Sequence, residues 1–333
     1  MIEKKISDKQ IKPHTVFPFG KKEGLRIVFM GTPDFAVTSL DKLLVNNFNI
    51  VGVITSPDKP AGRGLNLQQS PVKKYAFEKG LHILQPVKLK DPLFLQELAT
   101  LQADLQVVVA FRMLPEQVWQ MPAMGTINLH GSLLPQYRGA APINWAIING
   151  EKETGVTTFK LQHQIDTGNI LLSETIAIGE DETAGELHDR MKDTGANLIL
   201  KTIQGLTKGS LAEHPQAEQI LVNDRDLKTA PKISTTTCMI DWTRPVDEVY
   251  NLIRGLSPHP SAYTYLERKM LKIFKAKKEI TAASIQPGNI DTDKRSYLKY
   301  ACPDGFISIT ELQLEGKKKL SVGDFLRGYH FED

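Results

Sequence analysis

Short apolar runs alternate with segments of helical spacing along the first two-thirds of the chain. Residues 25–30 form an apolar run that ends at Gly31, which predicts a buried strand, and the apolar positions from Phe35 to Leu44 recur at helical spacing. Strands that alternate with helices indicate right-handed βαβ units, so we expect an α/β domain with a parallel sheet over residues 25–205. The other predicted strands are 50–54, 82–84, 103–111, 126–130, 156–161 and 170–175, and the other predicted helices are 71–79 and 183–203.

The pattern changes after Gly205. Residues 206–231 are polar and show little periodicity, which is typical of a linker. One helix is predicted at 245–256, and short β-like segments follow it, with proline–glycine and aspartate–glycine turns between them. Residues 232–333 therefore predict a small β-barrel. Its clearest strands are 271–275, 297–301 and 307–314.

The length and composition fit two globular domains. The chain has 333 residues, 41% of them apolar, and a typical domain has about 100–200 residues. Its two cysteines, Cys238 and Cys302, are far apart and match neither a disulfide framework nor a zinc site. No apolar stretch is long enough for a membrane span, and residues 1–24 form a polar N-terminal extension without the apolar run of a signal peptide. A cytoplasmic enzyme is the simplest interpretation.

The net charge of +3 is unevenly distributed. Residues 230–333 carry 16 Lys and Arg against 13 Asp and Glu, which leaves 25 basic and 25 acidic residues in the rest of the chain. The positive excess therefore lies in the last third. This indicates a polyanionic partner for the second domain.

Two turns follow predicted strands, at the edge where open α/β sheets bind ligands. Residues 31–35 open a helix but lack the glycine spacing of a dinucleotide-binding motif, so we interpret them as a tight turn. Residues 57–64 contain two prolines, two glycines and the cations Lys59 and Arg63. They form either a plain surface loop or a basic arm that meets a phosphate-bearing substrate.

The end of the strand at 126–130 carries the strongest candidate chemistry. Period-2 alternation places Asn128 and His130 on one face of that strand, and Asp166 follows in a later turn. An amide and an imidazole can donate hydrogen bonds to the oxyanion of a tetrahedral intermediate, and a carboxylate can fix the tautomer or the charge of the imidazole. The three residues therefore suit acyl transfer to an amine, although such a grouping also arises by chance.

Residues 128–135, Asn-Leu-His-Gly-Ser-Leu-Leu-Pro, resemble the signature of the formyltransferase family that uses 10-formyltetrahydrofolate. The longer string 128–142 resembles the methionyl-tRNA formyltransferases within that family. The resemblance extends to 31–35, 57–64, 165–168, 240–242 and 316–318. It implies a Rossmann-like catalytic domain followed by an OB-like β-barrel that binds tRNA. It also implies transfer of the formyl group to the amino group of a charged initiator tRNA. We expect a monomer.

The resemblance assigns roles to individual residues. Asn128, His130 and Asp166 are the implied catalytic residues. The implied folate contacts are Phe111, Arg112, Met113, Leu114, Ser132, Leu133, Leu134, Pro135 and Ile165. The implied tRNA contacts are Lys59, Arg63, Arg138, Lys277, Lys278, Lys317 and Lys318. We expect no metal, because no histidine–carboxylate pair has the spacing of metal ligands.

The sequence departs from the family pattern at two places. Residues 110–115 lack the glycine expected after the aromatic residue and are one residue shorter, which bears on the folate contacts. Asn169 stands where an acidic residue is frequent.

Other functions use the same donor. A formyltransferase that acts on a UDP-linked amino sugar would have the same three catalytic residues, but the basic loop and the basic last third favour tRNA. A deformylase would not need a basic second domain, and a glycinamide ribonucleotide enzyme would need only the first domain. A non-catalytic RNA-binding protein would not need the catalytic residues.

Overall fold

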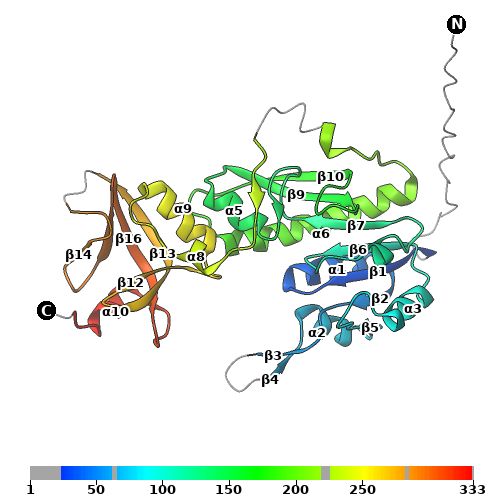
Figure 1. Ribbon diagram of the computed structural model, residues 1–333, viewed down its shortest axis with the longest axis horizontal. Helices are drawn as coiled ribbons and strands as arrows, with labels where there is room; N and C mark the ends of the chain where they lie inside the picture. The colour runs from blue at the N-terminus through cyan, green and yellow to red at the C-terminus, as the bar shows by residue number, and fades with distance from the viewer. Residues whose placement is uncertain (1–23, 62–65, 219–225, 282–284, 332–333) are drawn as a thin grey trace, which may run out of the picture.

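The computed structural model describes residues 24–61, 66–218, 226–281 and 285–331. Most of the predicted N-terminal extension and Arg63 lie outside these residues. The chain forms an α/β domain and a smaller β-rich domain beside it, joined by the segment that follows the longest helix (Figure 1). No helix in the described residues is long and apolar enough to cross a membrane.

The first domain is built on a seven-stranded sheet with the order β10-β9-β7-β6-β1-β2-β5. Its strands are β1 (Arg26–Gly31), β2 (Asn49–Ile54), β5 (Ile83–Leu84), β6 (Leu105–Val109), β7 (Thr126–His130), β9 (Glu153–Lys160) and β10 (Ile170–Ala177). The first five in chain order run parallel, as the sequence predicts. Among these strands, β9 alone runs in the opposite direction: it is antiparallel to β7 and to β10, so the expected parallel sheet is interrupted there. β9 and β10 form a hairpin, and the strands of a hairpin must run in opposite directions.

Helices cover both faces of this sheet. Ile27 and Phe29 of β1 point into one core with α1 (Asp34–Val45) and α6 (Ala184–Lys208), and Val28 and Met30 point into the other core with α3 (Pro92–Thr100). This alternation explains why β1 is continuously apolar from Ile27 to Met30. The remaining helices of this domain are α2 (Pro71–Glu78), α4 (Glu116–Trp119) and α5 (Pro142–Ile148), and β3 (Lys59–Ala61) and β4 (Asn66–Gln68) form a separate hairpin.

The predicted linker packs along the first domain. α6 continues to Lys208, beyond the predicted end at 203, and Gly209 ends it in the left-handed conformation at φ 63°. His214 then forms a β-bridge with Ile170. At the other end, β11 (Thr229–Ala230) pairs in parallel with β8 (Arg138–Gly139). Both ends of the segment are therefore fixed to the domain that precedes it.

The second domain is an antiparallel half-barrel with the strand order β12-β13-β16-β15-β14 and β17 paired to β16. Its two outer strands, β12 and β14, do not pair with each other in the described residues, so the predicted barrel is open there. The strands are β12 (Ala262–Leu266), β13 (Lys269–Ile280), β14 (Ile290–Thr292), β15 (Leu298–Cys302), β16 (Gly305–Leu314) and β17 (Leu320–Ser321). The helices are α8 (Thr235–Cys238), α9 (Val246–Leu256) and α10 (Val322–Arg327).

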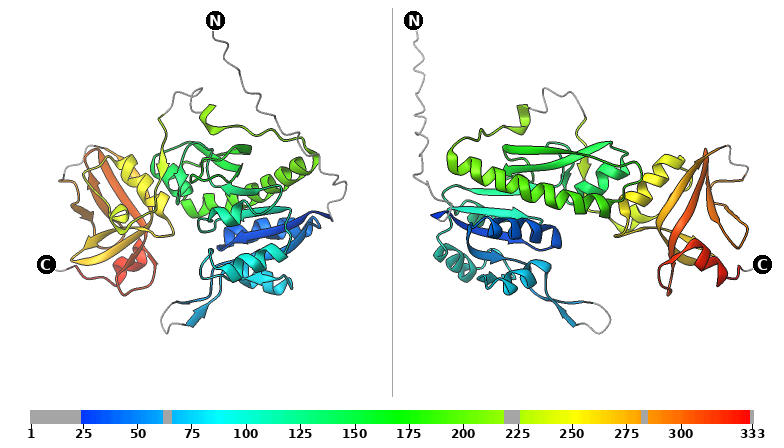
Figure 2. Two further views of the ribbon diagram at one scale, coloured as in Figure 1. Left: turned by 45° about the vertical axis from the view of Figure 1, so that its right-hand side comes forward. Right: turned by 180° about the vertical axis from the view of Figure 1, so that it is seen from behind.

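The two domains meet where α9 packs against α5 and against the loop before α6 (Figure 2). Arg254 of α9 is buried there and donates hydrogen bonds to the carbonyls of Gly179 and Glu182, at 3.3 and 3.1 Å. Tyr250 of the same helix donates to Asp181 at 2.6 Å. Buried polar groups need partners, and these partners exist only when the domains are docked.

Candidate active site

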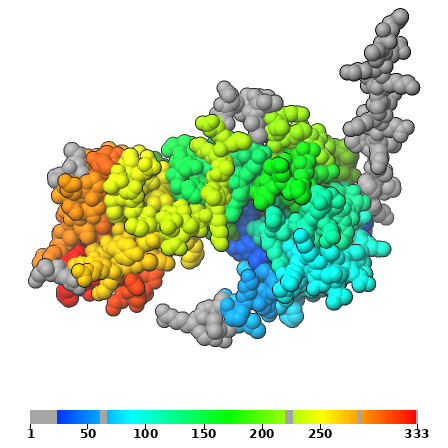
Figure 3. Space-filling model, viewed as in Figure 1, coloured from blue at the N-terminus to red at the C-terminus, as the bar shows by residue number. Residues whose placement is uncertain are grey.

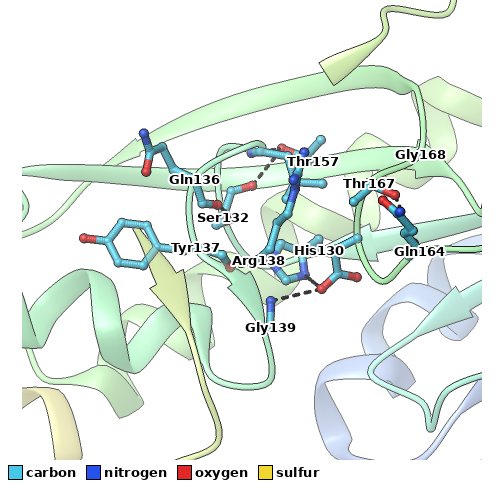
Figure 4. Close-up of polar contacts among 12 residues, drawn as sticks. His130, Ser132, Gln136, Tyr137, Arg138, Gly139, Thr157, Gln164, Thr167 and Gly168 are labelled. Atoms are coloured by element: carbon cyan, nitrogen blue, oxygen red, sulfur yellow. Dashed lines mark hydrogen bonds and ion pairs between the residues drawn. The ribbon is translucent and has the colours of Figure 1, made fainter. Parts of the chain in front are cut away.

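Asn128 and His130 lie at the end of β7 and line one cavity, together with Asp166 from the β9–β10 loop. The Nδ1 atom of His130 is 3.9 Å from Oδ2 of Asp166 (Figure 4). The sequence predicted this grouping from strand alternation and from one acidic turn. The structure brings all three residues together.

A backbone carbonyl holds the His130 ring. Its Nε2 atom is 2.8 Å from the carbonyl oxygen of Tyr137, and the ring is only 7% exposed. Because a carbonyl can only accept, Nε2 carries a proton, and Nδ1 is the atom that faces Asp166. The tautomer is thus fixed by Tyr137, and Nδ1 is left on the side of Asp166.

Asp166 is held in an unusual conformation. Its backbone is left-handed at φ 53°, and its Oδ2 atom accepts a hydrogen bond of 3.0 Å from the Gly139 amide. Arg138 is close enough to interact with its charge: burial lowers the pKa of the Arg138 guanidinium, and the carboxylate of Asp166 acts in the opposite direction.

Asn128 has its amide available for a ligand. The side chain is partly exposed to the cavity and makes no hydrogen bond within the described residues. An unused amide donor at the end of a strand can stabilise a developing oxyanion without first breaking another bond.

The cavity has a volume of about 1010 Å³ and walls that are mainly apolar. Met113 and Ile165 line it, and these two residues are 75% and 63% exposed. Exposed large apolar side chains in a concave site indicate an apolar or aromatic ligand. Phe111 and Leu114 also line this wall, so five of the nine residues predicted to contact folate surround the cavity. These five are Phe111, Arg112, Met113, Leu114 and Ile165.

Arg112 mainly holds its own loop in place. Its guanidinium donates to the carbonyls of Pro86 and Val87, lies over the Phe111 ring, and has a buried Nε without a partner in the described residues. Burial lowers the pKa of this side chain. Residues 110–115, which depart from the family pattern, are therefore fixed by Arg112. Its two terminal nitrogens donate hydrogen bonds to backbone carbonyls.

Residues 132–135 do not line the cavity, so their predicted folate contact finds no support in this structure. The Ser132 hydroxyl is buried and donates to the carbonyl of Gln136 at 2.6 Å. The Leu134 amide donates to the Thr157 hydroxyl at 3.2 Å, and that hydroxyl donates to the Ser132 carbonyl at 2.7 Å. Leu133 and Pro135 belong to the same loop, which connects His130 to Tyr137. These hydrogen bonds fix the loop.

Two predicted tRNA contacts have structural partners instead. Arg138 is half-buried and donates from Nε and Nη2 to Gln216, at 3.0 and 2.6 Å. Lys278 forms ion pairs with Asp247 at 2.7 Å and with Glu180 of the first domain at 3.8 Å. The side chains that remain exposed are Lys59, Lys277, Lys317 and Lys318.

One group of possible metal ligands occurs in the described residues, formed by Asp34, His188 and Asp189. Lys192 already supplies a positive charge there, at 3.5 Å from Asp34 and 2.8 Å from Asp189. This group fits a surface ion-pair network on α1 and α6.

Three residues of the site were not assigned from the sequence. Tyr137 and Gly139 act through backbone groups, which their side-chain types do not indicate. Gln216 lies in the polar segment after α6, where no local pattern marks it.

Comparison with known proteins gives matches along almost the whole chain. The Formyl transferase family model matches residues 25–203, and the Formyl transferase, C-terminal domain model matches 232–330. A methionyl-tRNA formyltransferase of Bacteroides fragilis is 51% identical over 94% of this chain and 98% of its own length. That of Parabacteroides distasonis is 53% identical over 93% of this chain and 97% of its own length.

Solved structures share the fold. An N-formyltransferase from Helicobacter canadensis, in complex with folinic acid and dTDP-3-aminofucose, is 23% identical over 89% of this chain and all of its own, with a TM-score of 0.64. HypX from Aquifex aeolicus, in complex with tetrahydrofolic acid, is 18% identical over 92% of this chain and 48% of its own, with a TM-score of 0.62.

Proposed function

This chain belongs to the formyl transferase family, and from that membership we infer that it transfers the formyl group of 10-formyltetrahydrofolate to the amino group of methionyl-tRNA. The observation that carries this proposal is the convergence of Asn128, His130 and Asp166 in one large cavity with apolar walls. The monomer and the cytoplasmic location predicted from the sequence remain part of the proposal.

The cavity suits the formyl donor. The wall that contains Phe111, Met113 and Ile165 offers apolar surface to a flat pterin. The donor supplies a formyl carbon bonded to N10, from which it must be displaced.

In the proposed reaction, the amine nitrogen of the methionyl group attacks the formyl carbon. The amide of Asn128 donates a hydrogen bond to the oxyanion that develops on the formyl oxygen. The bond from carbon to N10 then breaks, while the amine loses a proton and N10 gains one. His130 moves this proton at Nδ1, because its Nε2 is committed to Tyr137. Asp166 stabilises the positive charge of the ring during the transfer.

Other residues of the cavity lining suit the acceptor. Pro33, Phe35 and Ile143 line the cavity and offer apolar surface to a thioether side chain.

The molecular surface is hollowed between the second domain and β3 and β4 (Figure 3). Lys59 is an exposed cation of β3, and Lys277, Lys317 and Lys318 are exposed on the second domain. We propose that these side chains contact phosphates of the acceptor arm.

One assay distinguishes this function from its alternatives. Formyl-labelled 10-formyltetrahydrofolate is incubated separately with methionyl-tRNA, with a nucleotide-linked amino sugar, and with buffer alone. We expect label in N-formylmethionyl-tRNA. Label only in the sugar or only in formate would overturn the proposal.

A further inference from the structure

We propose that Gln216, in the segment between the two domains, is a positioning residue that holds Asp166 in its catalytic place. This inference rests on the proposed function, since it concerns the same reaction. Gln216 is 3% exposed although it lies in a polar stretch of sequence. A buried glutamine needs a partner for each of its hydrogen-bonding groups.

Its bonds converge on the Asp166 loop. The Nε2 atom of Gln216 donates to the carbonyl of Asp166 at 2.9 Å and to that of Gly168 at 2.8 Å. Its Oε1 atom accepts from Nε and Nη2 of Arg138, at 3.0 and 2.6 Å. All four hydrogen-bonding positions of the amide are used. The orientation of the amide is unambiguous, because a guanidinium only donates and a carbonyl only accepts.

Asp166 requires support of this kind. Its left-handed backbone is unfavourable for a residue with a side chain, so contacts on both sides must hold it. Gly139 holds the carboxylate through its amide, and Gln216 holds the backbone. Loss of the second contact lets the loop relax and changes the 3.9 Å separation between Asp166 and His130.

The chain around Gln216 is itself anchored. The amide and the carbonyl of His214 exchange hydrogen bonds with Ile170, at 2.9 and 2.8 Å. Glu213 pairs with Lys160 at 2.5 Å and accepts from Asn169 at 3.1 Å. The segment after α6 therefore reaches Asp166 from a fixed position, and the active site is incomplete without it.

Three variants test this role: Gln216→Met, Gln216→Glu and the control Gln136→Met. Methionine keeps the length and volume of glutamine but removes all four bonds. In the described part of the chain, the side chain of Gln136 bonds only to the other end of the segment, through the Asp226 carbonyl and the Lys228 amide, and not to Asp166. A displacement of about 1 Å at a reacting group can cost about 10²-fold in rate. We expect Gln216→Met to lower kcat by about that factor, with KM for both substrates nearly unchanged and with tetrahydrofolate binding retained. The control should stay near wild type.

The Gln216→Glu variant tests the positioning role through the pH dependence of kcat. Its carboxylate can still accept from Arg138, but it repels the carbonyls of Asp166 and Gly168. Once protonated, it can donate to one of them. The ratio of variant to wild-type kcat should therefore rise as the pH falls through the pKa of the introduced carboxyl group.

Several outcomes would overturn the proposal. These are an unchanged kcat in Gln216→Met, an equal loss in Gln136→Met, a raised KM without a change in kcat, a flat pH ratio in Gln216→Glu, or failure of both Gln216 variants to fold. Wild-type transfer to methionyl-tRNA is measured in parallel. Its absence would count against the proposed function, whereas its presence with unaffected variants would count against the role of Gln216 alone.

Discussion

At the scale of single residues, the site combines side chains with backbone groups. Asn128 and His130 face the same way because residues two apart in a strand share a face. The carbonyl of Tyr137 leaves His130 with one working nitrogen, and the amide of Gly139 orients the carboxylate of Asp166. Chemistry at this site therefore depends on the course of the loop after β7 as well as on three side chains.

Removal of either side chain on β7 should affect the reaction rather than the fold. We expect Asn128→Ala to lower kcat by about 10²–10³, because one oxyanion donor is lost. His130→Ala should lower kcat by about 10²–10⁴, because proton transfer loses its general acid–base group. Steady-state kinetics with methionyl-tRNA measures both. Asn46→Ala, at the end of α1, is the control, and near-normal turnover in either active-site variant would refute the assignment.

The thiols should be inert in the folded protein. Burial raises the pKa of Cys302 to about 11 and also raises that of Cys238. At pH 8 almost no thiolate is present at Cys302, so a disulfide reagent should label it slowly until urea unfolds the chain. Above pH 9 the unfolded thiol ionises while the folded one stays protonated, and this difference lowers stability between about pH 9 and pH 11. Fast labelling of the native protein would contradict this expectation.

Sequence reasoning found the residues whose side-chain types suggest chemistry. It missed Tyr137 and Gly139, which act through backbone groups, and Gln216, which acts through its side-chain amide. Asn128, His130 and Asp166 were predicted because an amide, an imidazole and a carboxylate suggest chemistry by their type. Gln216 was missed because it is 50 residues from Asp166 in the sequence, and local sequence patterns carry no information on contacts at that separation.

At the scale of elements, apolar runs predicted the central strands well, since β1 and β6 are buried on both faces. The reversed direction of β9 was not predicted, because apolar periodicity carries no information on chain direction. β8 and β11 were missed for a different reason. Each has two residues, and they exist only because distant segments pair. The start of α3 does carry a signal in the sequence, because Asp91 caps the helix and Pro92 occupies its first position.

The start of α6 offers a test at this scale. Thr183 accepts from the amide of Glu186, and the Glu186 carboxylate accepts from the amide of Thr183, so the two form a capping box. Thr183→Ala should lower the free energy of unfolding by about 0.5–2 kcal/mol, measured by urea denaturation. Thr194→Ala, in the middle of the same helix, should be neutral or slightly stabilising, because alanine has the higher helix propensity. An equal loss in both variants would contradict a capping effect.

At the scale of the whole molecule, adjacent lysines on β13 have different tasks. Lys278 pairs with Glu180 and so links the two domains, whereas Lys277 is exposed. Neighbouring residues of a strand point to opposite faces, so only one of them can serve the interface. The basic residues of the last third therefore have two roles. Lys278 helps to dock the domains, and exposed lysines such as Lys277 are free to contact a polyanion.

The exposed lysines should control the salt dependence of tRNA use. We expect a variant with Lys277, Lys317 and Lys318 changed to glutamate to raise KM for methionyl-tRNA more than it lowers kcat. The slope of log KM against log salt should flatten, since fewer counterions are released on binding. Hydrolysis of formyl-folate without tRNA should stay unchanged.

Lys278→Ala is the comparison for that experiment, because it removes a domain contact rather than an exposed charge. It should leave the salt slope near that of wild type. An unchanged slope and KM in the triple variant would show that these lysines are only a solvated surface.

The pairing of β11 with β8 also bears on how this protein could be recombined. Ala230 belongs to the core of the first domain, and a Cβ on Gly139 would lie 2.4 Å from its carbonyl oxygen, so a side chain at position 139 would clash with this segment. The family model of the first domain nevertheless stops at residue 203. A chimera that exchanged the second domain at that boundary would import a foreign strand beside the catalytic loop. A junction after Pro231 would keep β11 in the same chain segment as β8, its partner in the first domain.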